Sequence, residues 1–203
     1  MNKWLVSVPV VMALAAGAAQ AAGDPEAGKQ KAAPCAACHG MDGNSPNPIW
    51  PKLAGQHPSY IEKQIHDFKT GERKDPLMTP QAALLPTDQD VADVAAFFAA
   101  QTQSTGIAKA EAVELGGALY RGGNMASGVA ACSGCHGPAG MGNPLANFPR
   151  ISGQHADYIA KSLKDFRDGN RANDVNSMMR GVAARMTDEE IAAVSQFIQG
   201  LSQ

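Results

Sequence analysis

Cys35-Ala-Ala-Cys38-His39 and Cys132-Ser-Gly-Cys135-His136 are two copies of one pattern, Cys-x-x-Cys-His, and together they use all 4 cysteines of the chain. In each copy the two thiols lie on one helical turn, and the histidine directly follows the second thiol. Each thiol can form a thioether bond to one vinyl group of a haem, and the histidine then reaches the iron as its proximal ligand. The sequence therefore predicts two covalently bound haem c groups, attached through Cys35, Cys38, Cys132 and Cys135, with His39 and His136 as iron ligands.

A Cys-x-x-Cys pair also occurs in two other kinds of site. Thioredoxin-type redox motifs contain it between a strand and a helix, and zinc sites use it as half of a ligand set. The first is disfavoured because this alanine-rich sequence has few strand-forming segments. The second is disfavoured because the two pairs stand about 100 residues apart and each has its own histidine. A disulfide within one pair would be strained.

The first residues have the pattern of an export signal. Met1-Asn2-Lys3 is basic, an apolar run extends from Trp4 to about Ala19, and Ala19-Gln20-Ala21 is a cleavage site of the A-x-A type. We therefore predict a signal peptide over residues 1–21, a mature chain that starts at residue 22, and a location in a bacterial periplasm. A retained, uncleaved anchor is the alternative. No other segment has the ~20 apolar residues that span a bilayer.

The charge pattern excludes one class of partner. The formal net charge is −2, and the lysines and arginines form no cluster, so the sequence has no nucleic-acid footprint. Residues 22–101 carry more acidic than basic side chains, whereas residues 102–203 carry equal numbers. This asymmetry predicts a dipole that can orient the molecule when it docks on a partner.

The two haem motifs belong to an internal repeat with a period of about 100 residues. Its best-matched segments are Pro51-Lys-Leu-Ala-Gly-Gln-His57 and Pro149-Arg-Ile-Ser-Gly-Gln-His155. Further matches occur in the same order: Tyr60-Ile61 with Tyr158-Ile159, Asp67-Phe68 with Asp165-Phe166, Arg73 with Arg171, and Thr87-Asp88 with Thr187-Asp188. A duplicated domain explains this agreement. We predict an N-terminal domain over residues 22–101, a polar linker over 102–109 and a C-terminal domain over 110–203.

Each unit contains the start and stop signals of three helices. These signals are an Asp or Thr cap, a proline at the first helical position, and a glycine after the last turn. Within the helices, apolar residues recur at three- and four-residue spacing. The first predicted helix runs from Asp24 toward Cys35, and its counterpart runs over about Ala110 to Gly122. The middle helix covers about Pro58 to Thr70, and its counterpart ends at Gly169. The last helix of each unit begins with a capping box, Thr87–Asp90 or Thr187–Glu190. The fold class is all-α, with small domains that gain much of their core from the haem.

The sixth ligand of each iron has to come from the opposite side of the haem, and methionine is the donor expected there. In the first unit Met41 is too close to His39 in the chain to cross the ring. That leaves Met78 as the predicted ligand of the first iron.

The second unit offers more than one methionine for this role. Met78 precedes the threonine cap of the last helix by nine residues, and Met178 has the same spacing in the second unit. The repeat therefore favours Met178, with Met179 as the alternative. Met186 aligns with Pro86 and is interpreted as a core residue.

Other repeated residues can support the iron sites. The carbonyl of Pro51 or Pro149 can accept a hydrogen bond from Nδ1 of the proximal histidine, although a purely loop-shaping role is the alternative. His57 and His155 make bis-histidine ligation an alternative, but we interpret them as structural or as contacts to a haem propionate. The repeated arginines either bind a propionate or are solvated.

With these residues in order, the sequence resembles the cytochrome c4 family, the dihaem periplasmic cytochromes built from two class I cytochrome c domains. The resemblance covers essentially all of the chain after residue 21. It rests on both Cys-x-x-Cys-His motifs, the two Gly-Gln-His segments and the approaches to the last helices around Met78 and Met178. It implies His/Met ligation of both irons and two domains that face each other about a pseudo-two-fold axis, with the propionates near the interface.

The function implied by this resemblance is that of an electron carrier, not an enzyme. Two irons with six ligands each leave no open position, so the predicted mechanism is outer-sphere transfer of one electron at a time. The expected donor is a membrane respiratory complex and the expected acceptor a terminal oxidase, which dock transiently on a monomer loosely associated with the membrane surface. The alternatives are a haem subunit of a larger dehydrogenase, a dihaem peroxidase with an open distal position, and a gas-binding sensor that binds carbon monoxide.

Overall fold

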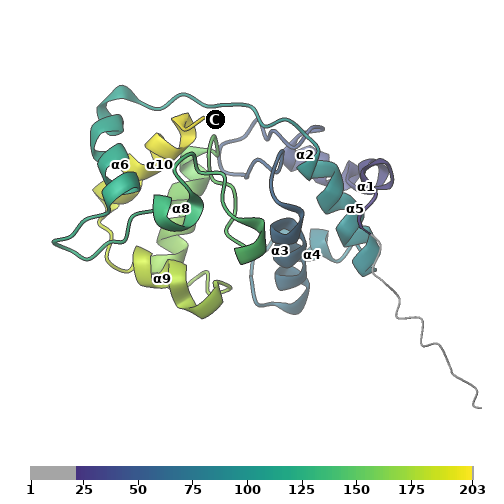
Figure 1. The fold of residues 1–203 in the computed structure, drawn as a ribbon. Coiled ribbons are helices and arrows are strands. Elements are labelled where there is room, and N and C mark those ends of the chain that lie inside the picture. Colours follow the sequence, from purple (N-terminus) through teal and green to yellow (C-terminus); the bar gives the residue numbers. More distant parts are fainter. Residues whose placement is uncertain (1–21, 203) are drawn as a thin grey trace, which may run out of the picture.

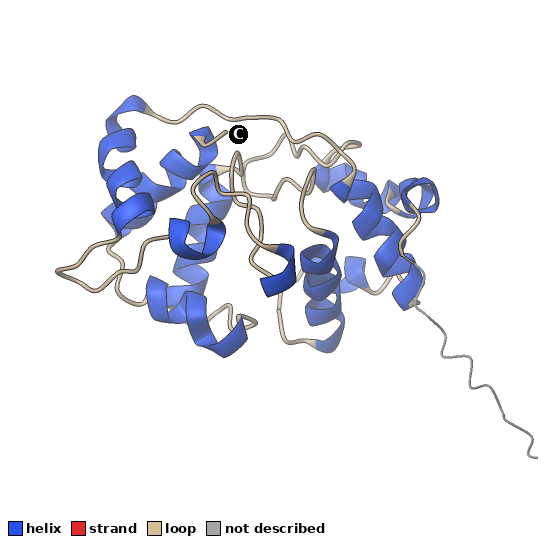
Figure 2. Cartoon of the chain, in the orientation of Figure 1, coloured by secondary structure: helices blue, strands red, loops and turns tan. Residues whose placement is uncertain are grey.

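The computed structural model describes residues 22–202, in which every regular element is a helix (Figure 2). Two isolated β-bridges, Asn124–Val129 and Asn143–Phe148, are the only strand-like pairings in that range. The predicted signal peptide, residues 1–21, lies outside the described residues. Between residues 22 and 202 no helix is long and apolar enough to cross a membrane.

The helices form two sets that follow the predicted repeat. The first set is α1 (Pro25–Lys31), a 3-10 turn η1 (Ala33–Cys35), α2 (Ala36–His39), α3 (Pro58–Thr70), α4 (Met78–Ala82) and α5 (Asp88–Ala99). The second set is α6 (Ala110–Gly122), α7 (Ser133–His136), η2 (Pro144–Ala146), α8 (Ala156–Arg167), η3 (Val175–Ser177), α9 (Met178–Ala183) and α10 (Asp188–Gly200). The two sets lie side by side, and an extended segment from α5 to α6 joins them (Figure 1).

The predicted caps are present at the helix ends. Asp24 accepts hydrogen bonds from the backbone N–H groups of Glu26 and Ala27, so α1 begins as its sequence predicts. Both last helices open with complete capping boxes, in which the Thr side chain and the acid three residues later each bond to the other's backbone N–H. The short helices α4 and α9 were not predicted, because five or six residues are too few for a clear apolar period.

Thr187→Ala is expected to lower the free energy of unfolding by about 1 kcal/mol, because it removes the hydroxyl that accepts the Glu190 N–H at the start of α10. Urea unfolding of the haem-loaded protein measures this loss. Thr105→Ala, at an exposed linker threonine, is the matched control and is expected to stay within about 0.5 kcal/mol of wild type. Equal losses in the two variants would contradict the assigned cap.

Each set of helices has its own hydrophobic core. In the first, the predicted apolar faces of α3 and α5 are buried together, and Cys35, Leu53 and Met78 pack half-buried against them. In the second, the faces of α6, α8 and α10 are buried together, and Cys132 and Met179 are among the half-buried residues against them. An attachment thiol and one methionine of each unit therefore border the same core.

Two glycines allow the first and last helix of each unit to cross closely. A Cβ atom at Gly28 would lie 1.9 Å from the backbone oxygen of Asp93, and one at Gly116 would lie 2.3 Å from that of Ala193. Any side chain would therefore push α1 from α5, or α6 from α10. These crossings bring α1 and α6 over the core before the chain turns toward Cys35 and Cys132.

Candidate haem sites

The predicted proximal histidines, His39 and His136, are buried and are oriented by the proline carbonyls that the sequence indicates. His39 Nδ1 donates to the Pro51 carbonyl at 2.8 Å, and His136 Nδ1 donates to the Pro149 carbonyl at 3.0 Å. These bonds hold the proton on Nδ1 and leave Nε2 with its lone pair for a metal. Burial lowers the pKa of both imidazoles, which favours the neutral form that binds iron.

The cysteines have surroundings that suit attachment, not thiolate chemistry. Burial raises the pKa of the Cys35 thiol and raises that of Cys132 to about 11, the opposite of what a redox-active Cys-x-x-Cys pair requires. None of the four cysteines is in a disulfide. Across residues 22–202, no group of three or more His, Cys, Asp or Glu side chains could hold a metal ion, so the zinc alternative gains no support.

Met78 lies at the start of α4, half-buried against the first core. The Asp75 side chain fixes this start, because its Oδ1 accepts from the backbone N–H groups of Leu77 and Met78, both at 2.9 Å. Leu77 beside it is exposed. The loop therefore directs one side chain toward the core and its neighbour outward.

In the second unit the adjacent methionines differ in the same way. Met178 is 40% exposed, whereas Met179 is half-buried and packs against the second core. The buried residues Ala183 and Met186 follow Met179 at the spacing with which Ala82 and Leu85 follow Met78. Met186 is thus the counterpart of Leu85 and fills the core as predicted, although a count from the helix cap pairs it with Pro86.

The match of Met186 with Leu85 explains why a count of nine residues back from the helix cap favours Met178. Pro86 has no counterpart in the second unit, so the second unit is one residue shorter between the core residue Met186 and the cap Thr187. A count that begins at the cap crosses this difference and moves by one position. Aligned through the buried residues, Met78 corresponds to Met179 and Leu77 to Met178.

An ion pair holds the loop that precedes Met179. Asp174 Oδ1 accepts from Arg180 Nε at 2.7 Å, and its Oδ2 accepts from the Arg180 backbone N–H at 2.9 Å. Asn176 and Ser177, within the loop, both have left-handed backbone angles, with φ of 52° and 57°. Residues other than glycine rarely adopt this conformation because it is strained. The contacts between Asp174 and Arg180, here called the clamp, offset that strain.

His57 and His155 contact the opposite unit. His57 Nε2 donates to the Met141 carbonyl at 2.7 Å, and His155 Nε2 donates to the Ser45 carbonyl at 2.8 Å. Their Nε2 atoms are therefore engaged in the contact between units, and bis-histidine ligation gains no support. The sequence repeat marks these positions, but a repeat alone does not distinguish a site within each unit from a contact between them.

The repeated arginines also bridge the units. Arg73 donates to the Tyr158 hydroxyl at 3.1 Å, and Arg171 donates to the Tyr60 hydroxyl at 2.9 Å. Burial alone would raise the pKa of Tyr158, but the two guanidinium groups lower it to about 7. Arg171 is buried, and its hydrogen bonds within residues 22–202 go to neutral side chains. Two guanidinium groups therefore bond to hydroxyl and amide groups at the interface, and the buried carboxylate of Asp67 joins the same network through Asn173.

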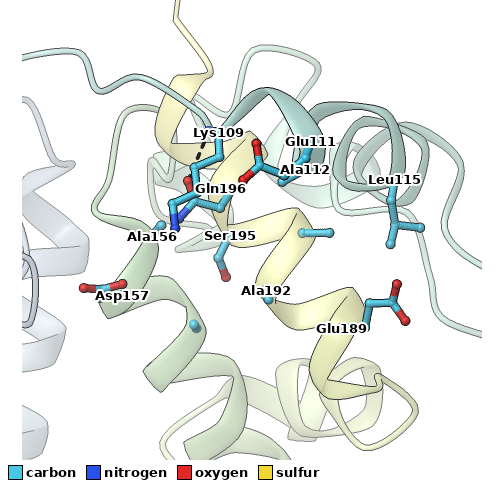
Figure 3. A pocket seen from close by; sticks show the side chains of 12 residues that line it. Lys109, Glu111, Ala112, Leu115, Ala156, Asp157, Glu189, Ala192, Ser195 and Gln196 are labelled. Atoms are coloured by element: carbon cyan, nitrogen blue, oxygen red, sulfur yellow. Dashed lines mark hydrogen bonds between the residues drawn. The ribbon is translucent and has the colours of Figure 1, made fainter.

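A separate surface hollow of about 360 Å³ lies between α6, α8 and α10 (Figure 3). Alanine is the commonest residue in its lining, which also includes the charged side chains of Glu111, Asp157 and Glu189. No cysteine, histidine or methionine lines it. It is therefore not part of the predicted iron sites.

The residues present fit a covalently attached haem in each unit. Each has two thiols on one helical turn, an imidazole whose Nδ1 is held by a proline carbonyl, and a methionine packed against the core of that unit. Imidazole with thioether is a ligand pair found in cytochromes c.

Comparison with known proteins agrees with this site chemistry. The family described as cytochrome c matches twice, at residues 25–101 and 116–202. Cytochrome c4 of Thiocapsa roseopersicina is 59% identical over 92% of this chain and 97% of its own. The crystal structure of reduced recombinant cytochrome c4 from Pseudomonas stutzeri superposes with a TM-score of 0.86 at 50% identity, covering 89% of this chain and all of that one.

A more distant relative carries a different name. The thiosulfate dehydrogenase electron acceptor of Stutzerimonas stutzeri is 38% identical over 83% of this chain and 79% of its own.

The two matching cytochrome c segments and the full-length relatives indicate two covalently bound haem c groups in an all-α chain of two tandem cytochrome c domains. On these grounds the chain belongs to the cytochrome c4 family of dihaem electron-transfer cytochromes.

Proposed function

We propose that this protein is a periplasmic electron carrier, without catalytic activity of its own, that takes electrons one at a time from a membrane respiratory complex and delivers them to a terminal oxidase. The observation that carries the proposal is that each unit supplies both an oriented histidine and a core-packed methionine. With the four nitrogens of a haem, such a pair would fill all six coordination positions of the iron and leave none for a substrate. The bound haem supplies a one-electron Fe(III)/Fe(II) couple, whose potential a methionine ligand raises.

The proposed ligands are His39 with Met78 in the first unit and His136 with Met179 in the second. The proposed covalent bonds to the haem vinyl groups are made by Cys35 and Cys38 in the first unit and by Cys132 and Cys135 in the second. Met179 is preferred to Met178 because it shares with Met78 the packing against a core and the distance to the following buried alanine. The two proposed methionine ligands then have the same packing and spacing, although the loops before them differ in sequence.

Partners are proposed to dock beside the methionine loops, on a monomer that associates loosely with the membrane surface. Leu77 and Met178 are exposed large apolar side chains, each directly before a proposed ligand. A small apolar contact with a polar rim favours the short-lived complexes of redox proteins. Because Leu77 and Met178 occupy equivalent positions, each unit has such a contact, and donor and acceptor can use different units.

A second candidate function is that of electron acceptor for a dehydrogenase. It rests on the 38% identical relative named as the electron acceptor of thiosulfate dehydrogenase. This role uses the same haem sites and differs only in the donor. Stable co-purification with a dehydrogenase from the native source would favour it over a mobile respiratory carrier.

An anaerobic spectroelectrochemical titration tests the proposed function. We expect two haems, both with the weak methionine-to-iron charge-transfer band when ferric, both with high potentials, and neither with a spectral response to carbon monoxide when ferrous. Loss of the band from one wild-type haem, with carbon monoxide binding there, would instead indicate a displaceable ligand and favour a peroxidase or a gas sensor.

A further inference from the structure

The peptide bond that orients His39 is itself hydrogen-bonded to the other unit. The Pro51 carbonyl accepts from His39 Nδ1 at 2.8 Å, and the N–H at the other end of the same peptide, that of Lys52, donates to Gln154 Oε1 at 2.9 Å. Gln154 belongs to the second unit. A side chain of one unit thus binds the amide group that holds the proximal histidine of the other.

The reverse contact is equally complete. The Pro149 carbonyl accepts from His136 at 3.0 Å, and the N–H of the same peptide, that of Arg150, donates to Gln56 Oε1 at 2.9 Å. Each glutamine also donates back through Nε2, Gln154 to the Lys52 carbonyl at 2.9 Å and Gln56 to the Arg150 carbonyl at 2.8 Å. The contact is reciprocal and follows the internal repeat.

The orientation of both glutamine amides is fixed by their partners. Gln56 Oε1 also accepts from the His57 backbone N–H, and Gln154 Oε1 from that of His155, both at 3.0 Å. Each oxygen therefore faces two N–H donors and each Nε2 faces a carbonyl, so a reversed amide would meet like groups. Both side chains are buried, at 8% and 5% exposed, so water competes little with these bonds.

We propose that each glutamine sets the reduction potential of the haem in the opposite unit: Gln154 that of the first haem and Gln56 that of the second. An amide whose N–H donates a hydrogen bond has a more negative carbonyl oxygen, because bonds in such a chain polarise one another. The Pro51 carbonyl then accepts more strongly from His39, the imidazole carries more negative charge, and Fe(III) is favoured over Fe(II). Removing the glutamine bond reverses this and raises the potential.

Gln56 and Gln154 are positioning residues, since they act through the proline peptide and do not contact the iron. The inference rests on the proposed ligation by His39 and His136. A merely structural contact between units would change both haems together or neither. The crossed arrangement instead assigns the larger change in each variant to one haem, that of the unit that does not contain the substitution.

Gln154→Met and Gln56→Met test this, because methionine keeps most of the buried volume while its thioether sulfur is a much weaker hydrogen-bond acceptor than the amide oxygen that it replaces. In Gln154→Met we expect the ferric-to-ferrous ratio of the first haem at a fixed potential to fall about 2- to 3-fold, roughly the size of a weak net hydrogen bond. At 59 mV per tenfold this is an upward shift of ~20–30 mV, with a smaller shift at the second haem. Gln56→Met is expected to give the same upward shift at the second haem, with a smaller shift at the first.

The potentials are assigned with Met78→Leu and Met179→Leu, each of which alters one haem. The control is Ser59→Ala, which removes another hydrogen bond between units, from Ser59 Oγ to the Pro144 carbonyl, without touching either proline peptide; no crossed shift is expected. If wild type lacks the methionine band at either haem, the proposed function fails. If wild type has both bands but a Gln variant shifts both haems equally, only its own haem, or neither, the crossed inference is overturned.

Folding of the variants is checked by the methionine band and by thermal unfolding of the haem-loaded protein. A variant that retains both bands but loses its contact between units would shift both potentials through added solvent, which is the equal-shift outcome and counts against the proposal. Gln154→Leu and Gln56→Leu give the same test with a different apolar shape, should either methionine variant not fold.

Discussion

Met179→Leu is expected to reduce the methionine-to-iron charge-transfer band to about half, because one of two haems loses its proposed sulfur ligand. Leucine keeps the side-chain volume and the packing against the second core but supplies no donor atom. The second haem is then expected to bind carbon monoxide when ferrous, and its potential is expected to fall well below that of the first haem. Absorption spectroscopy and redox titration measure these changes.

Met178→Leu is the matched control for this prediction. Met178 is 40% exposed at the position equivalent to Leu77, so its replacement is expected to leave the band, the potential and the absence of carbon monoxide binding as in wild type. A Met178→Leu protein with half the band and an intact Met179→Leu protein would reverse the assignment. Met78→Leu is expected to match Met179→Leu, with the change at the first haem.

The clamp between Asp174 and Arg180 explains why the loop can distinguish two adjacent methionines. It fixes the backbone N–H of Arg180, the residue after Met179, while Asn176 and Ser177 turn the chain in left-handed conformations just before the pair. The direction of each side chain is then determined by its position on the first turn of α9. In the first unit Asp75 achieves the same result by binding the N–H of Met78 itself.

The sequence could predict most of what depends on local signals. The caps at Thr87 and Thr187 and the apolar faces of the long helices follow from spacing within a few residues. The proline carbonyls lie 12 and 13 residues from their histidines, and the repeated Pro51 and Pro149 segments indicated them. The position of the second methionine was harder, since a single residue, Pro86, separates an alignment through the cap from an alignment through the core. Only burial distinguishes the two.

The contacts between units could not be read from the repeat. Gln56 and Gln154 recur beside His57 and His155, which indicated a shared role. Whether that role lies within a unit or between units depends on how two copies face each other, and no local pattern encodes that. Figure 1 shows the loops before α3 and α8 converging between the two helix sets, where these side chains meet.

Cys35→Ala with Cys38→Ala is expected to prevent covalent attachment of the first haem and to unfold the first unit, with loss of about half of the helical circular dichroism. A domain of roughly 80 residues has only a small hydrophobic core, so a bound cofactor contributes a large share of its stability. In the first unit the predicted attachment residue Cys35 and the proposed ligand Met78 pack half-buried against the core, so an attached haem would extend that core.

The matched variant, Cys132→Ala with Cys135→Ala, is expected to unfold the second unit by the same reasoning, since Cys132 and Met179 border the second core in the same way. Replacing all four cysteines should leave little helix. Each unit also buries its Gly-Gln-His segment against the other, so loss of one haem is expected to lower the unfolding temperature of the unit that retains its haem. A quadruple variant with native-like circular dichroism would show that the helices pack without haem and would overturn this account of the core.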